Sequence, residues 1–343
     1  MKKTVFLHIG THKTGSTSVQ HFLHDNTDRL RSHGFLYPSS HLLECAHHRF
    51  GTTLLRDAGL SILKNDASSG AQSYSQAEPV ALADLRLWPD LKEEVEQTDC
   101  SYVIISSEEF EWVTQPEVIP RLLGNHNYKI VVCLRRQDHY LESVYQTFVK
   151  NKNVRLKAEP AKWIGKVVSG TGFHDYFNLL ERWAAVFGKE NILPIVFEDA
   201  IINRLEVEFL RTIGVDDAAA HDFVLPEESW LLEQRKSLDN RCLEFLRLCN
   251  QQSLDAKKHE AIVAALMLVS DAFRERRSYN KDILDVKQRS IILDSVRDSN
   301  QKLLKKYFPG RQRMFPELDL SQELDPIVIK RVVPLFMRFY EQG

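Results

Sequence analysis

Short, mostly continuous apolar runs recur along the first two thirds of the chain. They are rich in Val and Ile, which is typical of strands that are buried on both faces. The segments expected to form strands are 4–9 (TVFLHI), 35–38 (FLYP), 101–106 (SYVIIS), 129–134 (KIVVCL) and 192–197 (ILPIVF). Helical periodicity lies between these runs, so we expect parallel strands joined by helical crossovers, with ligands bound outside the carboxyl ends of the strands.

A different pattern fills the last third of the chain. From about Glu227 onward apolar residues recur at helical spacing, as in Leu238, Cys242, Phe245 and Cys249. This spacing is typical of amphipathic helices. We therefore predict a three-layer α/β core over residues 1–225, with a P-loop-type parallel sheet flanked by helices. Residues 226–343 are expected to form a helical carboxyl-terminal extension packed on that core.

Charge and cysteine content narrow the class of protein. The chain has 45 Lys and Arg against 47 Asp and Glu, a formal net charge of -2 and no long basic block, which disfavours nucleic-acid binding. Its 5 cysteines are scattered and never form a C-x-x-C pair, which disfavours a zinc site and favours a reducing compartment. No run approaches the ~20 apolar residues of a membrane span, so we expect a cytoplasmic protein without an integral membrane segment.

The strongest candidate for chemistry is the segment Gly10–Thr17 (GTHKTGST), between the first expected strand and the first expected helix. Backbone N–H groups and the helix dipole at such a junction bind anions. The spacing resembles a Walker A loop, except that Lys13 lies inside the loop and Ser16 directly follows Gly15. A lysine at a helix N-terminus is electrostatically unfavourable unless an anion joins both. The alternative reading is an ordinary tight turn with capping hydroxyls.

A second candidate anion site follows the fourth expected strand. That strand ends in Arg135 and Arg136, and Ser143 follows eight residues after Arg135. A guanidinium group and a hydroxyl group placed there can converge on one phosphate. The alternative is that both arginines only pair with Asp138 or Glu142 on a solvated surface.

Taken together, these residues resemble those of the sulfotransferase family. The run Lys13-Thr14-Gly15-Ser16-Thr17 after an apolar strand is similar to the family's 5′-phosphosulfate loop, and Arg135 with Ser143 is similar to its 3′-phosphate site. Segment 175–198 is similar to the family's helix and strand after the 3′-phosphate site, and segment 298–308 is similar to the carboxyl-terminal stretch of bacterial carbohydrate-type members. The resemblance implies sulfuryl transfer from 3′-phosphoadenosine 5′-phosphosulfate to a hydroxyl or amine of a carbohydrate-like or lipid-linked acceptor. The product would be adenosine 3′,5′-diphosphate, and no metal is implied.

The resemblance also implies roles for individual residues. Lys13 would stabilise the leaving phosphate oxygen, and a His or Glu would take the proton of the acceptor. Candidates for this base are His47, His48 and Glu108, with His48 favoured because imidazole titrates near pH ~6.5. Trp112 is the candidate for an acceptor platform. The residues expected to hold the donor are His12, Lys13, Thr14, Gly15, Ser16, Thr17, Arg135 and Ser143.

Three other functions stay open. A P-loop kinase shares the fold and the loop but depends on Mg²⁺, for which we find no ligand pair. A noncatalytic nucleotide-binding module would bind 3′,5′-diphosphates without turnover, and a helical scaffold would leave both anion sites unused. Acceptor pockets are built from loops, and the Ser-rich stretch Asn65–Glu78 is expected to be a surface loop or lid.

Overall fold

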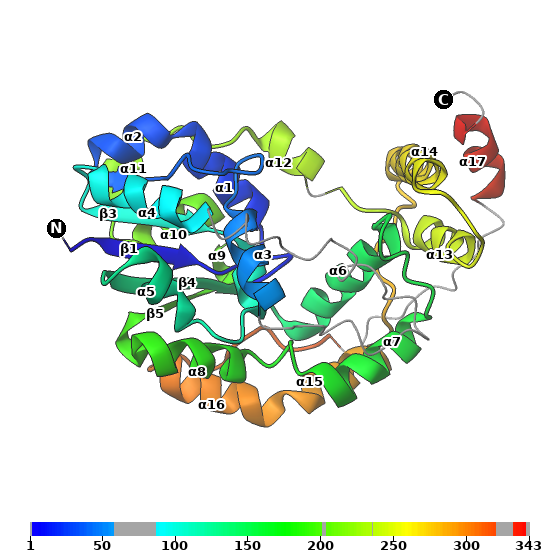
Figure 1. The fold of residues 1–343 in the computed structure, drawn as a ribbon. Coiled ribbons are helices and arrows are strands. Elements are labelled where there is room, and N and C mark those ends of the chain that lie inside the picture. The colour runs from blue at the N-terminus through cyan, green and yellow to red at the C-terminus, as the bar shows by residue number, and fades with distance from the viewer. Residues whose placement is uncertain (1, 58–86, 201–203, 235, 320–331, 341–343) are drawn as a thin grey trace.

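The computed structural model describes residues 2–57, 87–200, 204–234, 236–319 and 332–340. The stretch Asn65–Glu78 lies outside the described residues. Among those that are described, five strands form one parallel sheet in the order β2-β3-β1-β4-β5 (Figure 1). The strands are β1 (Thr4–His8), β2 (Phe35–Leu36), β3 (Tyr102–Ser106), β4 (Asn127–Leu134) and β5 (Ile192–Val196). The predicted parallel sheet is therefore confirmed.

The register of the sheet brings three loops together. β1 is the central strand, and Thr4 lies opposite Tyr102 of β3 and Asn127 of β4. Because all three strands point the same way, the segments that follow them meet at one edge of the sheet, where open α/β sheets bind their ligands. Those segments are the loop after β1, the turn after β3 and the turn after β4.

Helices cover both faces of the sheet, because successive strand residues point to opposite faces. On one face Phe6, Ile104 and Val131 pack against the first helices, and on the other Val5 and Leu7 pack into a second layer. The first layer contains α1 (Ser16–Asp25), α2 (Thr27–Ser32) and α10 (Leu205–Thr212). The second contains α3 (His48–Asp57), α4 (Leu87–Gln97), α5 (Val118–Leu123), α8 (Tyr176–Phe187) and α16 (Arg297–Tyr307). The three-layer α/β class is confirmed.

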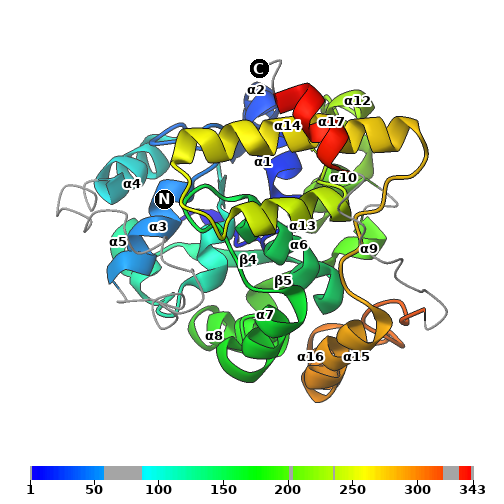
Figure 2. The same ribbon diagram turned by 90° about the vertical axis from the view of Figure 1, so that its right-hand side faces the viewer.

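A separate helical core lies beside the sheet, on the right of Figure 1 and facing the viewer in Figure 2. Its helices are α6 (Gln137–Lys150), α7 (Pro160–Lys166), α13 (Asn240–Cys249), α14 (Ala256–Glu275), α15 (Val286–Ser295) and α17 (Val333–Tyr340). Its buried residues run from Tyr140 to Val167 and from Leu238 to Phe336. The helical pattern expected after Glu227 is confirmed, and α6 and α7 join the same core.

Shorter elements connect these layers. The turn after β3 is the 3₁₀ helix η2 (Glu108–Trp112), and β5 runs directly into α9 (Phe197–Ala200). The others are η3 (Val167–Thr171), η4 (Lys189–Asn191), α11 (Asp217–Ala220) and α12 (Glu228–Gln234). No helix within the described ranges is both long enough and apolar enough to cross a membrane.

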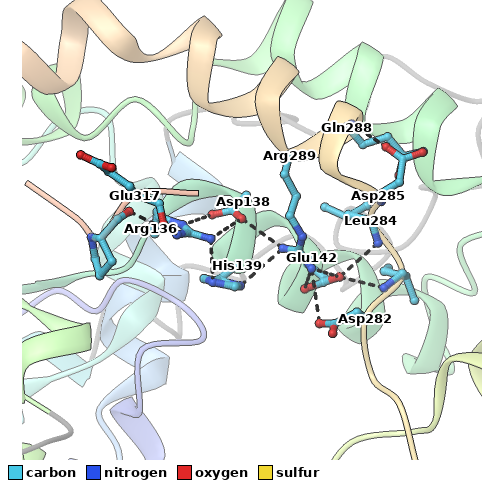
Figure 3. A network of polar contacts seen from close by, with 12 residues as sticks. Arg136, Asp138, His139, Glu142, Asp282, Leu284, Asp285, Gln288, Arg289 and Glu317 are labelled. Carbon is cyan, nitrogen blue, oxygen red and sulfur yellow. Dashed lines mark hydrogen bonds and ion pairs between the residues drawn. The ribbon is translucent and has the colours of Figure 1, made fainter. Parts of the chain in front are cut away.

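A buried ionic network joins α15 to α6 within the helical core (Figure 3). Arg289 of α15 is 2% exposed and donates to both carboxylate oxygens of Glu142 at 2.9 and 3.0 Å. The same guanidinium donates to Asp138 at 3.1 Å. Glu142 also accepts the backbone N–H groups of Ile283 and Leu284 at 2.8 and 3.2 Å. Burial raises the pKa of Glu142, and the charge of Arg289 opposes that rise.

Candidate functional site

The loop after β1 has a backbone that leaves N–H groups free. Gly10, Lys13 and Gly15 adopt positive φ angles of 90°, 61° and 82°, a region that glycine enters readily and lysine rarely. A Cβ atom on Gly15 would lie 2.5 Å from Cδ2 of Leu205, so this position requires glycine. Within the described chain, the backbone N–H groups of residues 15–17 donate to no acceptor. Such free amides at a helix N-terminus favour an anion.

Two backbone hydrogen bonds attach the start of this loop to β4. The N–H of Thr11 donates to the carbonyl oxygen of Cys133 at 3.0 Å, and the N–H of Cys133 donates to the carbonyl oxygen of Gly10 at 2.6 Å. The hydroxyls of Thr14 and Ser16 are buried and donate to the Thr11 carbonyl oxygen at 2.5 and 3.3 Å. These hydroxyls stabilise the loop from within, while that of Thr17 is exposed.

Arg135, the first residue after β4, reaches the lysine of the loop. Its Nη1 donates to the carbonyl oxygen of Lys13 at 3.0 Å, and its guanidinium lies 5.3 Å from the ring centroid of Phe197. Arg136 has a different role, because it is buried and donates to both carboxylate oxygens of Asp138 at 2.7 and 2.9 Å. Of the two arginines, Arg135 is therefore the one whose guanidinium lies beside the loop after β1.

Ser143 lies in the middle of α6 and is half-buried. No hydrogen bond or ion pair joins its hydroxyl to Arg135 within the described ranges. The structure thus brings Arg135 to the loop between β1 and α1, the candidate phosphate site that is called the phosphate loop below. Ser143 lies further along, on α6.

Positive charges gather around Lys13. Desolvation lowers the pKa of Lys13, the charge of Glu108 raises it and the charge of Arg135 lowers it again. Desolvation and then the charge of Lys13 lower the pKa of Lys150, at the end of α6, to about 8. Sequence reasoning missed Lys150, because nothing in its local pattern indicates that the charge of Lys13 acts on it. Cations that repel one another in this way favour a bound anion.

The candidate bases lie at the start of α3 and in η2. Nδ1 of His48, the first residue of α3, is 3.2 Å from the Ser107 hydroxyl and 3.7 Å from Oε2 of Glu108. Gln20 of α1 donates to the same Glu108 oxygen at 2.8 Å. Nε2 of His48 contacts no polar partner among the described residues, and the side chain is 26% exposed. His48 therefore has one nitrogen oriented by the protein and one free.

Glu108 lies directly over the loop, since a Cβ atom on Gly10 would be 3.0 Å from that of Glu108. Burial alone would raise the pKa of this carboxyl group, but the charges of His12 and His48 and the hydrogen bond from Gln20 lower it. Glu108 is therefore ionised at neutral pH and is a weaker base than an imidazole.

His47 is buried and uses both of its ring nitrogens inside the protein. Nε2 lies 3.0 Å from the carbonyl oxygen of Pro38, and the N–H of Ser106 donates to Nδ1 at 3.2 Å. Burial lowers the pKa of this imidazole to about 4. Neither nitrogen is left to accept a proton from a substrate, so the geometry favours His48 and Glu108 over His47.

We predict that acid will destabilise the protein through two buried histidines. Burial lowers the pKa values of His8 and His47 from 6.5 to about 4, so the unfolded chain binds more protons below pH 6.5. Stability is present above that pH and is lost as the pH falls toward 4. We expect each histidine to reduce the free energy of unfolding by about 2 kcal/mol between pH 7 and pH 5. Urea denaturation at both pH values measures this loss.

The variant His47→Gln provides the control, because glutamine cannot take up a proton. It should lower stability at pH 7 and make the loss between pH 7 and pH 5 smaller than in the wild type. An unchanged pH dependence would show that His47 does not titrate in this way.

His12 contacts residues of η2. Its backbone N–H and its Nδ1 lie 2.8 and 2.7 Å from Oε2 of Glu111. Its ring stacks on Trp112 with centroids 4.0 Å apart. The predicted acceptor platform is thus in contact with the phosphate loop. No group of three or more His, Cys, Asp or Glu is arranged to hold a metal ion in the parts of the chain that are described.

Comparisons with known proteins give few relatives. No family model matches the chain. A protein of Archaeoglobus fulgidus described as uncharacterized is 26% identical over 242 residues, which are 67% of this chain and 62% of that protein. The chain thus spans less than two thirds of the length of this curated relative. A crystal structure of a sulfotransferase from Alicyclobacillus acidocaldarius matches 74% of this chain and 98% of its own, with 14% identity and a TM-score of 0.41.

Proposed function

We propose that this protein is a sulfotransferase. It would move a sulfuryl group from 3′-phosphoadenosine 5′-phosphosulfate to a hydroxyl or amine of a carbohydrate-like or lipid-linked acceptor. The observation that carries this proposal is the junction of Lys13 and Arg135, whose guanidinium lies 3.0 Å from the lysine carbonyl oxygen. A loop lysine and a strand-end arginine brought together in this way suit a ligand with two separate anionic groups.

The reaction is an in-line displacement at sulfur. The acceptor oxygen or nitrogen forms a bond to sulfur as the bond from sulfur to the bridging oxygen of the 5′-phosphate breaks. The electron pair of the broken bond stays on that oxygen, where Lys13 and the free amides of residues 15–17 would stabilise the charge. The acceptor proton passes to Nε2 of His48, while the Ser107 hydroxyl and Glu108 orient the ring through Nδ1.

Glu108 has a supporting role in this proposal. A carboxylate beside the Nδ1–H of an imidazole fixes the tautomer and stabilises the imidazolium that forms. Oε2 of Glu108 lies 3.7 Å from Nδ1 of His48, so its charge would stabilise the imidazolium, while the Ser107 hydroxyl at 3.2 Å would fix the tautomer. Ser143, half-buried on α6, would add a hydroxyl contact to the phosphate held by Arg135.

Calorimetry tests the donor class. Adenosine 3′,5′-diphosphate should bind without Mg²⁺ and at least about ten times more tightly than ADP, because Arg135 offers charge-assisted hydrogen bonds to the 3′-phosphate. Binding of ATP that requires Mg²⁺ would instead indicate a kinase. Tight binding of the 3′,5′-diphosphate without transfer to any of a panel of carbohydrate acceptors would indicate a noncatalytic module.

The variant Arg135→Ala makes the same test specific to the second phosphate. We expect the affinity for adenosine 3′,5′-diphosphate to fall about 10- to 100-fold, since hydrogen bonds to charged groups contribute about 1.5–3 kcal/mol. Affinity for AMP should stay within about threefold. Arg297→Ala is the matched control, because Arg297 is 66% exposed and pairs with Asp294 at the end of α15. Equal losses for both nucleotides would contradict the assignment of Arg135.

A further inference from the structure

Glu111 lies at a junction of three elements and is 2% exposed. Its Oε2 accepts two hydrogen bonds from His12 of the phosphate loop, from the backbone N–H at 2.8 Å and from Nδ1 at 2.7 Å. Its Oε1 accepts the hydroxyl of Tyr140 at 2.6 Å. Tyr140 is buried in α6, the helix that begins just after Arg135. One carboxylate therefore joins η2, the phosphate loop and α6.

The partner of Glu111 is a charged imidazole. Burial lowers the pKa of His12, but hydrogen bonds to Glu109 and Glu111 and the charges of both raise it to about 10. His12 is therefore protonated at neutral pH, with Nε2 3.9 Å from Oε1 of Glu109. Its ring lies nearly parallel to the indole of Trp112, at an interplanar angle of 11°. The two stacked rings belong to the loop after β1 and to η2, and both of these segments border the proposed reaction centre.

Stability alone does not account for such a pair. Desolvation of two buried charges offsets much of their attraction, and apolar replacements are often as stable. A buried pair does fix the relative position of the elements that carry it. Here those elements are the loop with Lys13 and the 3₁₀ helix that starts at Glu108.

We propose that Glu111 is a positioning residue that acts through His12 to hold Lys13 in line with the acceptor base. This inference rests on the proposed function. His12 directly precedes Lys13, whose φ angle is 61°, so fixing the N–H and the ring of His12 fixes the start of the lysine residue. Glu108, on the same short helix as Glu111, faces His48. A misplacement of about 1 Å between the reacting groups can reduce the rate about 100-fold.

The variants Glu111→Gln, His12→Gln and their double test this proposal. We expect each single change to lower kcat about 10- to 100-fold, while the affinity for adenosine 3′,5′-diphosphate stays within about threefold. Because both residues act as one unit, the double variant should be no slower than the slower single variant. His33→Gln is the matched control, since His33 pairs at 3.1 Å with the exposed Asp222 and should leave kcat unchanged.

The pH dependence of the rate of Glu111→Gln is a second test, because a purely structural role of Glu111 would leave that dependence unchanged. The acidic groups that act on His12 are Glu109 and Glu111, and its charge in turn acts on Glu108. Removing the charge of Glu111 takes away one of the carboxylates that raise the pKa of His12 and leaves Glu109, with Glu108 acting through its charge. The rate of this variant should therefore fall as the pH rises through the lowered pKa of His12. The wild-type rate should show no such fall over the same pH range.

Three outcomes would overturn the inference. The losses of the single variants could add in the double variant, donor affinity could fall as much as kcat, or kcat could stay at the wild-type value. A wild-type protein that transfers no sulfuryl group at all would instead overturn the proposed function, and this inference with it. Melting temperatures of each variant separate a loss of folded protein from a loss of rate.

Discussion

Replacing Lys13 by alanine is expected to reduce kcat for sulfuryl transfer by about 100- to 1,000-fold. The lysine would act on the oxygen that gains charge as the bond to sulfur breaks, so its contribution is largest in the transition state. Affinity for adenosine 3′,5′-diphosphate should fall less than about tenfold, because Arg135 and the loop amides keep their contacts. Single-turnover assays with a radiolabelled donor, together with calorimetry, measure the two effects separately.

Lys152→Ala is the matched control for that experiment. Lys152 is 46% exposed and pairs at 2.6 Å with Glu260 in the helical part, so its loss should leave both kcat and donor affinity unchanged. A Lys13→Ala variant with the wild-type rate would refute the role of Lys13. A loss confined to binding would support a nucleotide-binding module.

Replacing His48 by glutamine is expected to lower kcat about 100- to 10,000-fold, because the acceptor would keep its proton in the transition state. Glu108→Gln should cost less, since the Ser107 hydroxyl still orients the ring at 3.2 Å and Glu108 acts on it only from 3.7 Å. Acceptors with increasingly acidic hydroxyl groups should restore the rate of His48→Gln, because a hydroxyl that is already ionised needs no base. Rates across such an acceptor series measure this rescue.

Replacement of His47, the neighbour of His48, is expected to affect stability and not the rate. His47→Gln should lower the melting temperature, because both nitrogens of His47 bond to backbone groups of Pro38 and Ser106. Its kcat per folded molecule should change little. If His47→Gln abolished transfer in a folded protein while His48→Gln did not, the assignment of the base would be reversed.

The sheet could be predicted because its strands are buried on both faces, which leaves a continuous apolar run such as KIVVCL in the sequence. The position of the loop between β1 and α1 could also be predicted, since Gly10, Lys13 and Gly15 lie close together along the chain. The contact of Arg135 with Lys13 could not be predicted from neighbouring residues alone, because it depends on β4 lying next to β1. The alternating strands and helices predicted parallel pairing but did not specify which strands are neighbours.

Other parts of the site left no mark in the sequence. His47 and His48 are adjacent and have the same side chain. They differ in their contacts near the start of α3, because the ring of His48 lies beside Ser107 and that of His47 beside Pro38. Glu111 has the same difficulty, since its partners His12 and Tyr140 are 99 and 29 positions away along the chain. Pairings of this kind arise only when the sheet order brings distant loops together.

The network around Arg289 sets a lower limit on the length of chain that can form this fold. A fragment that ends at residue 225 would retain Glu142 inside α6 without the guanidinium of Arg289 and without the N–H groups of Ile283 and Leu284 that Glu142 accepts. Uncompensated buried carboxylates destabilise a protein strongly. The same fragment would also lack Leu303 and Phe315, which belong to the apolar core beneath the sheet. The segment with the phosphate loop is therefore not an autonomous folding unit, and its helical neighbours are part of the scaffold on which it is built.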